Sequence, residues 1–195
     1  PHDDAARPEW FSRAIDTVAT EIMQRINAAV AVTPINLLAV VLLATPRQAL
    51  LEGDLERQLA LYAELLRAFP YASEVHVTGD SAAAIIQCGE QMGLLERRSH
   101  PAGDVLRMVE HNAVLATYYR NNVLHLFALP SLVACAFLNN PVVRHEDVHR
   151  LVWRVYPYVR EELFLRWSEE ELPGVVDGVR RTGAGLVRPG APAVE

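Results

Sequence analysis

The residues with the most specific chemical pattern in this chain are His145 and His149, in the sequence HEDVH. On a helix, two histidines four residues apart lie on one face, where they can bind zinc while Glu146 acts as a general base. The sequence specifies no third ligand, because residues 169–171, at a plausible separation, belong to a stretch with capping-box spacing. The helix dipole explains acidic residues in a first turn without a metal. We therefore predict an exposed helix start and no metal site, with a zinc hydrolase as the least favoured alternative.

Two other His–Asp pairs, His76 with Asp80 and His100 with Asp104, lie in short segments rich in turn residues. Turn polarity explains both pairs without any catalytic role. The chain contains no G-x-S-x-G nucleophile elbow and no Gly-rich phosphate loop, and its two cysteines have no metal-binding or redox spacing. We therefore predict no catalytic residue, no cofactor-binding residue and no cofactor in this chain.

A polar cluster interrupts the most apolar stretch of the sequence, TYYRNNVLHLFALPSLVACAFL at 117–138. This stretch is too apolar for a surface helix, and polar groups buried in it need hydrogen-bonding partners. Two alternatives remain for those partners: they lie inside the domain, or they lie on a second domain packed against it. The cluster, predicted as structural or interdomain, consists of Arg120, Asn121, Asn122 and His125.

Four helices and a β-hairpin are expected in the first half of the chain. Apolar residues at helical spacing predict a first helix over residues 11–26. Thr33 followed by Pro34 predicts the start of a second, short and apolar helix. Two more helices and two short strands are predicted over residues 53–69, 81–92, 94–97 and 105–109. The order of helices followed by a two-stranded wing predicts a winged-helix-like lobe over residues 8–110.

The second half is expected to consist of longer helices. An apolar helix is predicted over residues 112–139, with a bend near Pro130. An amphipathic helix is predicted over residues 145–164, with a kink at Pro157. Ser168 and Glu171 then have the spacing of a capping box.

The domain organisation follows from these elements. A long-helix lobe over residues 111–182 is expected to pack on the first lobe. From Gly183 onward the sequence predicts a strand and then a loose tail, so that residues 183–195 are assigned to the tail. The predicted fold class is mainly α, with a winged-helix-like first half and long apolar helices in the second.

Charge and hydropathy argue against a nucleic-acid partner and against a transmembrane helix. The net charge of −6 argues against nucleic acid, whose phosphates require a basic face. The predicted helix over residues 81–92, which would enter a DNA groove, contains no Arg or Lys. The apolar run at 35–44 is too short to cross a bilayer, and the run at 123–138 is interrupted by His125 and Pro130. We therefore expect no nucleic-acid partner and no transmembrane helix.

Four segments, in this order, resemble the C-terminal region of bacterial PlsB-type (membrane-associated) glycerol-3-phosphate 1-O-acyltransferases. They are RINAAVAVTPINLLAVVLLAT at 25–45, LRAFPY at 66–71, TYYRNNVLHLFALPSL at 117–132 and YPYVREELFLRWSEEELP at 156–173. The resemblance covers roughly residues 10 to 185. Four ordered segments are far more specific than one short motif.

The resemblance also implies what this chain lacks. Acyltransferases of this family carry a His and an Asp separated by four residues, and no His of this sequence has an Asp at that spacing. The family's phosphate-binding and Pro-Glu-Gly motifs are also missing. The chain therefore resembles the helical part that follows the catalytic domain, and it does not begin with Met, so we expect a fragment of a larger protein. By itself it should be inactive.

The partners implied by the resemblance belong to the full-length enzyme. They are the catalytic acyltransferase domain of the same protein and, through it, acyl-CoA or acyl-carrier protein, glycerol 3-phosphate and the membrane surface. The implied location is the cytoplasmic face of the bacterial cell membrane, as a peripheral protein. The alternative is a free-standing helical scaffold or protein-interaction domain of winged-helix ancestry.

Overall fold

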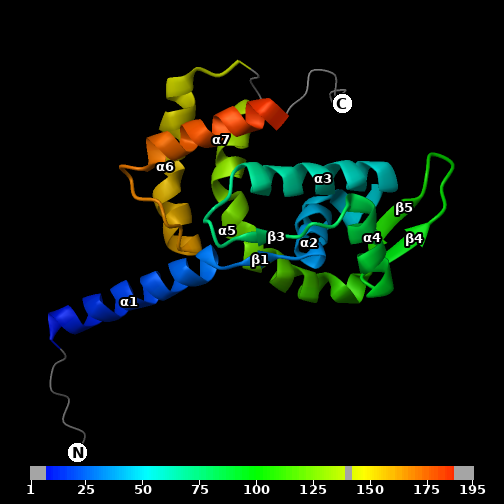
Figure 1. Ribbon diagram of the computed structural model, residues 1–195, viewed down its shortest axis with the longest axis horizontal. Helices are drawn as coiled ribbons and strands as arrows, with labels where there is room; N and C mark the ends of the chain where they lie inside the picture. Colours follow the sequence, from blue (N-terminus) through cyan, green and yellow to red (C-terminus); the bar gives the residue numbers. More distant parts are fainter. Residues whose placement is uncertain (1–7, 139–141, 187–195) are drawn as a thin grey trace, which may run out of the picture.

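The computed structural model describes residues 8–138 and 142–186. These residues form seven α-helices with two small β-sheets, which confirms the mainly helical class. Helix α1 (Glu9–Ala28) projects away from the other elements, and only its C-terminal end lies against them (Figure 1). Helices α3, α4 and α5 pack around α2, whereas α6 and α7 pack on α5, so the first half of the chain provides most of the core.

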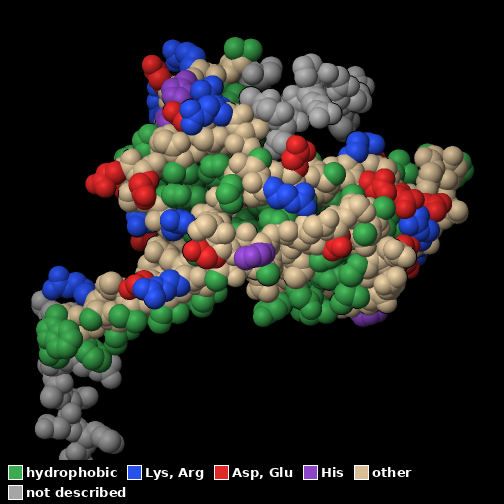
Figure 2. Space-filling model, in the orientation of Figure 1, with side chains coloured by type: hydrophobic (Ala, Val, Ile, Leu, Met, Phe, Trp, Pro, Cys, Tyr) green, Lys and Arg blue, Asp and Glu red, His purple; other side chains and the backbone are tan. Residues whose placement is uncertain are grey.

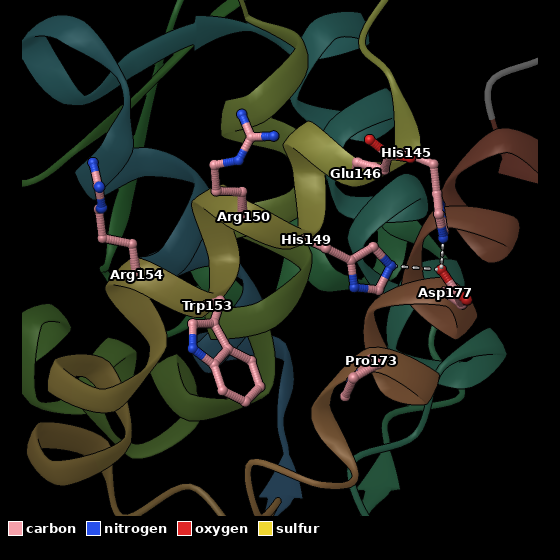
Figure 3. A pocket seen from close by; sticks show the side chains of 8 residues that line it. All are labelled: His145, Glu146, His149, Arg150, Trp153, Arg154, Pro173 and Asp177. Atoms are coloured by element: carbon pink, nitrogen blue, oxygen red, sulfur yellow. Dashed lines mark hydrogen bonds and ion pairs between the residues drawn. The ribbon is translucent and has the colours of Figure 1, made fainter.

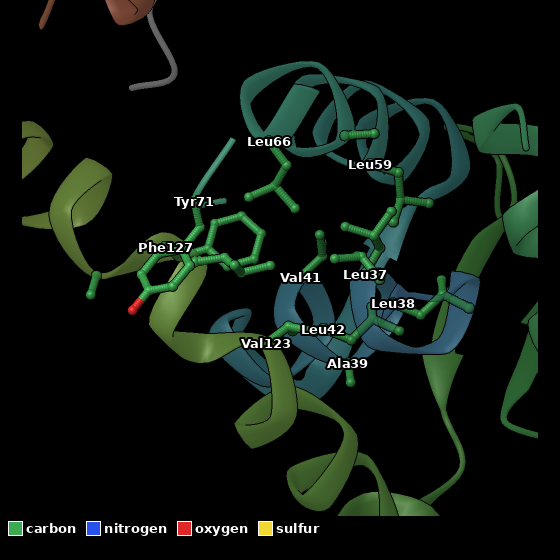
Figure 4. Packing of buried hydrophobic residues seen from close by; sticks show 14 of the residues in the cluster. Leu37, Leu38, Ala39, Val41, Leu42, Leu59, Leu66, Tyr71, Val123 and Phe127 are labelled. Carbon is green, nitrogen blue, oxygen red and sulfur yellow. The ribbon is translucent and has the colours of Figure 1, made fainter. Parts of the chain in front are cut away.

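Helix α2 (Pro34–Ala44) is the centre of the core. Thr33 caps it, because the Thr33 hydroxyl accepts from the Asn36 amide and the Asn36 side chain bonds back to Thr33 in a capping box. Apolar residues occupy most of the helix surface, and those at 37–39, 41 and 42 are at most 1% exposed. Around α2 lie α3 (Glu52–Ala68), α4 (Ala82–Gln91) and α5 (Ala113–Phe137), as Figure 4 shows in part for α3 and α5. The predicted start at Thr33-Pro34 is confirmed.

The predicted hairpin is present and is part of a larger sheet. Strands β4 (Leu95–Arg98) and β5 (Val105–Met108) pair antiparallel, and β2 (Ala49–Leu51) adds a third antiparallel strand in the order β2-β5-β4. Strands β1 (Ala31–Val32) and β3 (His76–Val77) form a separate parallel pair. We did not predict β1, β2 or β3, because strands of two or three residues are too short to show an alternating pattern.

Arg97 connects the larger sheet to two helices through ion pairs. Its guanidinium lies 2.7 Å from a carboxylate oxygen of Glu52 at the start of α3, and 2.8 Å from one of Glu90 in α4. A third carboxylate, that of Asp104 in the turn before β5, lies 3.1 Å away. The group is only partly exposed, and a network of several charges holds more firmly than an isolated surface pair.

The second half contains three helices, α5, α6 (His145–Leu163) and α7 (Leu172–Leu186). Helix α5 is long, as predicted, and Figure 1 shows it bent between a first half that lies below α2 and a second half that runs toward α7. Pro130 contributes to this irregularity, because it cannot donate a hydrogen bond to the turn before it. Helix α6 buries Val148, Val152 and Tyr156 along one face. It also contains Pro157, as expected.

Two predictions for this half need correction. The long helices are not apolar throughout: much of the first half of α5 is exposed, and α6 has a polar outer face. No helix within residues 8–138 and 142–186 is both long and apolar enough to cross a membrane. The strand predicted from Gly183 is wrong, because α7 continues to Leu186, and the rest of the predicted tail lies outside the described residues. The capping box at Ser168 and Glu171 is confirmed, since each backbone amide bonds to the other residue's side chain.

Candidate functional site

A polar joint connects the end of α1 to the rest of the molecule. Three polar side chains are buried within the described part of the chain, those of Asn27, Asn36 and His125. The Asn27 side-chain amide donates to the Leu163 carbonyl at 2.8 Å, and the Asn27 carbonyl accepts from Nε2 of His125 at 3.0 Å. Asn36 donates to the backbone of α5, at the carbonyl of Tyr119, at 2.8 Å. The joint therefore holds α5 against the connection between α1 and α2, and holds the end of α1 against the end of α6.

His125 is the centre of this joint, and it is neutral. Its side chain is 4% exposed, and this burial lowers its pKa below the ordinary value more than the hydrogen bond to Asn27 raises it. Because a carbonyl oxygen can only accept, Nε2 carries the hydrogen. The rings of His125 and Tyr71 make an edge-to-face contact, with their centroids 5.1 Å apart. His125 therefore acts as a buried neutral donor and not as a base exposed to substrate.

The loop between α6 and α7 closes the joint from the other side. Arg166 donates from its backbone amide to the Tyr71 hydroxyl at 3.0 Å and from its guanidinium to the Tyr71 carbonyl at 3.1 Å. Tyr156 donates from its hydroxyl to the Trp167 carbonyl at 2.8 Å. Burial raises the pKa of Tyr71 and raises that of Tyr156 to about 12, so both phenols stay protonated; that of Tyr156 donates to Trp167, and that of Tyr71 accepts from Arg166.

The predicted cluster on α5 divides into two parts. His125 is buried, whereas Arg120 is half-buried and Asn121 and Asn122 are exposed. Arg120 bonds to its neighbour, with its Nε 3.2 Å from the Asn121 side-chain oxygen. The alternative of one network buried inside this domain therefore does not describe all four groups. The reason is that before residue 123 α5 packs on α2 through one face only, where Ala116 is buried and the Tyr119 carbonyl accepts from Asn36, and its other face is exposed.

Large apolar side chains are exposed along α1. Trp10, Ile15, Val18, Ile22 and Ile26 are 50% to 62% exposed, and the three- and four-residue spacing of the last four places them on one face of the helix. Figure 2 shows hydrophobic side chains along the lower side of α1, with charged side chains above them. A contiguous exposed apolar surface of this kind marks a site of interaction.

The first half of α5 extends this surface. Val114, Leu115, Tyr118 and Leu124 are 84%, 47%, 64% and 36% exposed. Figure 2 shows hydrophobic side chains below the first half of α5, on the same side of the molecule as those of α1. We call the nine side chains of α1 and α5 named in this and the preceding paragraph the α1–α5 face. Asn121 and Asn122, also exposed on α5, lie between Tyr118 and Leu124 in sequence.

Sequence reasoning missed two residues that the structure brings to polar groups we had identified. Asn27 was not singled out, because it lies just past the predicted first helix at 11–26 and belongs to no recognised motif. Asp177 of α7 lies beside both His145 and His149 of α6, where we had considered only residues 169–171 as a third acidic group. In the pairs His76/Asp80 and His100/Asp104 each imidazole makes a local backbone contact: the ring of His76, the first residue of β3, bonds to the Glu74 carbonyl, and that of His100, in the loop before β5, bonds to the Ala102 amide.

The chain is similar over almost all its length to one family and its members. The family described as "Glycerol-3-phosphate acyltransferase C-terminal region" matches residues 1–184. The glycerol-3-phosphate acyltransferase of Xanthomonas campestris pv. campestris is 48% identical over 170 residues, which are 87% of this chain and 19% of that protein. Those of Pseudomonas aeruginosa and Xylella fastidiosa are 43% and 45% identical, over 88% and 85% of this chain.

The match is confined to one part of these relatives. The chain spans about a fifth of the length of the curated relatives it matches. No solved structure matches it.

Proposed function

This chain belongs to the family of glycerol-3-phosphate acyltransferase C-terminal regions, and from this premise we propose that it is the helical domain that supports the catalytic domain of such an enzyme. The enzyme would transfer an acyl group from acyl-CoA or acyl-carrier protein to the 1-hydroxyl of sn-glycerol 3-phosphate, the first step of phospholipid synthesis. The chain itself would contribute packing and no reacting group, because it contains no His-x4-Asp pair.

The exposure of the α1–α5 face is the observation that carries this proposal. A single helix standing alone in water is only marginally stable, and its stability in proteins comes mostly from packing of its apolar face. Five large side chains of α1 are at least half exposed, so this helix has its packing partner elsewhere. The relatives are about five times longer than this chain, and their remaining four-fifths provides such a partner.

Arg120, Asn121 and Asn122 fit the same surface as its polar component. Interfaces combine an apolar centre with hydrogen bonds, and Arg is enriched in them. Asn121 and Asn122 are exposed next to apolar side chains that are also exposed, so all these groups would be covered together. We therefore favour the interdomain alternative for these three residues, and the internal alternative for His125 alone.

We further propose that the chain is organised as two lobes, over residues 8–110 and 111–182, the first being winged-helix-like. The order α2-β2-α3-α4-β4-β5 and the sheet order β2-β5-β4 support this assignment. Helix α4 carries no Arg or Lys, so this lobe would serve packing and not DNA binding. The full-length enzyme would be peripheral at the cytoplasmic face of the bacterial membrane, with the lipid contact outside this chain.

A charge substitution on α1 tests the packing role. In the full-length acyltransferase that contains this region, Ile15→Glu, Val18→Glu and Ile22→Glu together should abolish most acyl transfer from labelled acyl-CoA, because three carboxylates cannot be buried at an apolar interface without partners. The matched control places the same charges on the opposite face, as Arg13→Glu, Thr17→Glu and Thr20→Glu, and should leave activity near that of the unmodified enzyme.

The same measurements discriminate against the alternative of a free-standing scaffold. If the triple substitution on the apolar face leaves activity and the melting temperature of the full-length enzyme unchanged, the α1–α5 face does not meet the catalytic domain. The 195-residue chain alone should form no lysophosphatidate from glycerol 3-phosphate and acyl-CoA. Turnover above a heat-inactivated sample would overturn the assignment of a supporting role.

A further inference from the structure

Two helices bring three potential metal ligands together at the end of the molecule opposite the α1–α5 face. His145 and His149 lie one turn apart at the start of α6, with ring centroids 4.4 Å apart. Nε2 of His149 lies 3.0 Å, and Nε2 of His145 3.4 Å, from the same carboxylate oxygen of Asp177 in α7. Figure 3 shows both rings directed at this oxygen.

We propose that His145, His149 and Asp177 form a binding site for a divalent transition-metal ion, with zinc as the preferred ion. All three ligand atoms lie within 4.8 Å of one another. In tetrahedral zinc sites the bonds are about 2.0–2.1 Å long, so neighbouring ligand atoms are about 3.3 Å apart. The two N–O distances, 3.0 and 3.4 Å, agree with this separation of neighbouring ligand atoms. Two imidazoles and one carboxylate are a donor set that suits zinc and its neighbours, and not magnesium or calcium.

A hydrogen-bonded triad without metal is the competing explanation. Each imidazole could donate its Nε2 hydrogen to Asp177, but all three side chains are 24% to 48% exposed, and exposed pairs of this kind contribute little to stability. Holding two rings of the same kind against one oxygen therefore gives the fold little advantage. Binding of a metal ion explains directly why three side chains with lone-pair donor atoms converge from two helices.

The surroundings leave room for a fourth ligand. The three residues line an open pocket of about 710 Å³ together with Glu146, Trp153 and two arginines, Arg150 and Arg154. Three protein ligands and an accessible fourth position are typical of zinc sites that hold water or substrate. We assign water to the fourth position; of the two guanidinium groups, that of Arg150 is paired with Asp147. Glu146 is close enough to line the pocket but is not counted among the ligands.

Zinc itself is the probe that tests the site. The 195-residue chain, stripped with a chelator and then titrated with zinc chloride in a calorimeter, should bind one zinc ion per chain and show a raised melting temperature. Asp177→Asn should weaken zinc binding by more than about tenfold, since removal of even an indirect contact to a metal ligand costs that much. The asparagine oxygen still accepts hydrogen bonds from both imidazoles, so the fold should be kept, as circular dichroism would verify. His149→Ala should have at least the same effect on binding.

Matched controls separate this site from adventitious binding to histidine. His100→Ala and His111→Ala remove exposed imidazoles elsewhere and should leave zinc binding unchanged, as should Glu146→Gln within the pocket. Binding that does not saturate at one ion per chain, or that is the same in Asp177→Asn as in the unmodified chain, would overturn the proposal. Because the pocket lies away from the α1–α5 face, the outcome is independent of how this domain meets the catalytic domain (Figure 2).

Discussion

Helices α1 and α2 are neighbours in sequence, and both are rich in large apolar residues, yet they have opposite surroundings. The apolar residues of α1 recur on one face and are mostly exposed, whereas those of α2 cover most of the helix surface and are buried. A helix that is apolar on all sides must be enclosed by its own domain, but a helix with one apolar face needs only a single surface. The difference indicates that α2 organises this domain, and it is the basis of the proposal that α1 packs on another part of the full-length protein.

Truncation of one leucine or isoleucine in each helix is the strongest test of this comparison. Leu42→Ala in α2 should lower the free energy of unfolding by about 2–5 kcal/mol, because it opens a cavity in a packed core. Ile15→Ala in α1 should change it by less than about 0.5 kcal/mol, because the side chain is half exposed. Urea titration of the 195-residue chain measures both values. A large loss with Ile15→Ala would mean that α1 packs on its own domain in solution.

A substitution at Gly89 sharpens the same comparison by probing how tightly α2 is packed. A Cβ atom at this position of α4 would lie 2.7 Å from Cδ1 of Leu38 and 2.9 Å from Cδ1 of Leu95. Gly89→Ala should therefore cost about 1–3 kcal/mol of stability. Gly53→Ala in α3 is the control, since its Cβ meets only the end of the Arg57 side chain, at 3.7 Å, and Ala is the better helix former. Equal melting temperatures for the two variants would show that α4 can move away from α2.

The joint between α1 and the core should depend on pH through His125. Burial lowers its pKa in the folded chain, whereas the unfolded chain has the ordinary value of about 6.5. The unfolded state therefore binds more protons between these two values, so stability is complete above about pH 6.5 and is lost as the pH falls toward the folded pKa. The neighbouring Tyr71, whose pKa burial raises, stays neutral over this range.

His125→Gln provides the measurement for that joint. The variant should lose about 0.5–1.5 kcal/mol at neutral pH, because the glutamine amide can still donate to the Asn27 carbonyl but the ring contact with Tyr71 is lost. It should also lose less further stability than the unmodified chain between about pH 7 and pH 5.5, since glutamine does not titrate. Parallel loss of stability in both proteins would show that His125 is not the group that titrates.

The smallest effect is expected at Arg120, and it tests the polar part of the α1–α5 face. Arg120→Ala should change the stability of the 195-residue chain by less than about 0.5 kcal/mol, because the guanidinium is half-buried and bonds to the adjacent Asn121. In the full-length enzyme the same variant should lower acyl transfer, while Arg98→Ala on the exposed strand β4 should not. Neutrality of Arg120→Ala in both proteins would remove this residue from the interface.

Local signals predicted much of the fold. Thr33 with Pro34, Ser81 and the turn around residues 100–103 each act over a few residues, and the helix starts and the hairpin they predict are present. The strand predicted after Gly183 is wrong, because contacts with distant residues outweigh the local signal there. Glycine and valine weaken a helix locally, but packing of Val176 and Val179 against the core keeps α7 helical to its end.

The candidate sites depended on contacts that no local pattern encodes. Asp177 is 28 residues from His149, and Asn27 is 98 residues from His125, so only the packing of α7 on α6 and of α5 on α1 reveals these pairs. We did not predict the exposure of Asn121. An apolar stretch indicates that its residues are buried, but it does not indicate whether they are buried within their own domain or against another one. Sequence reasoning singled out the polar residues of α5, and the fold was needed to separate the buried His125 from the others.

The attachment of α1 by one end makes it a lever. A helix of 20 residues is about 30 Å long, so a tilt of about 10° at Asn27 moves the far end by about 5 Å. The hydrogen bonds of Asn27, its side chain to Leu163 and its carbonyl to His125, thus set the angle at which the helix leaves the body. A small change in the packing of α5 or α6 at Asn27 would therefore produce a larger displacement at Trp10. If the hydrogen bonds hold α1 at a fixed angle, they also fix the distance between the core of this domain and the surface on which α1 packs.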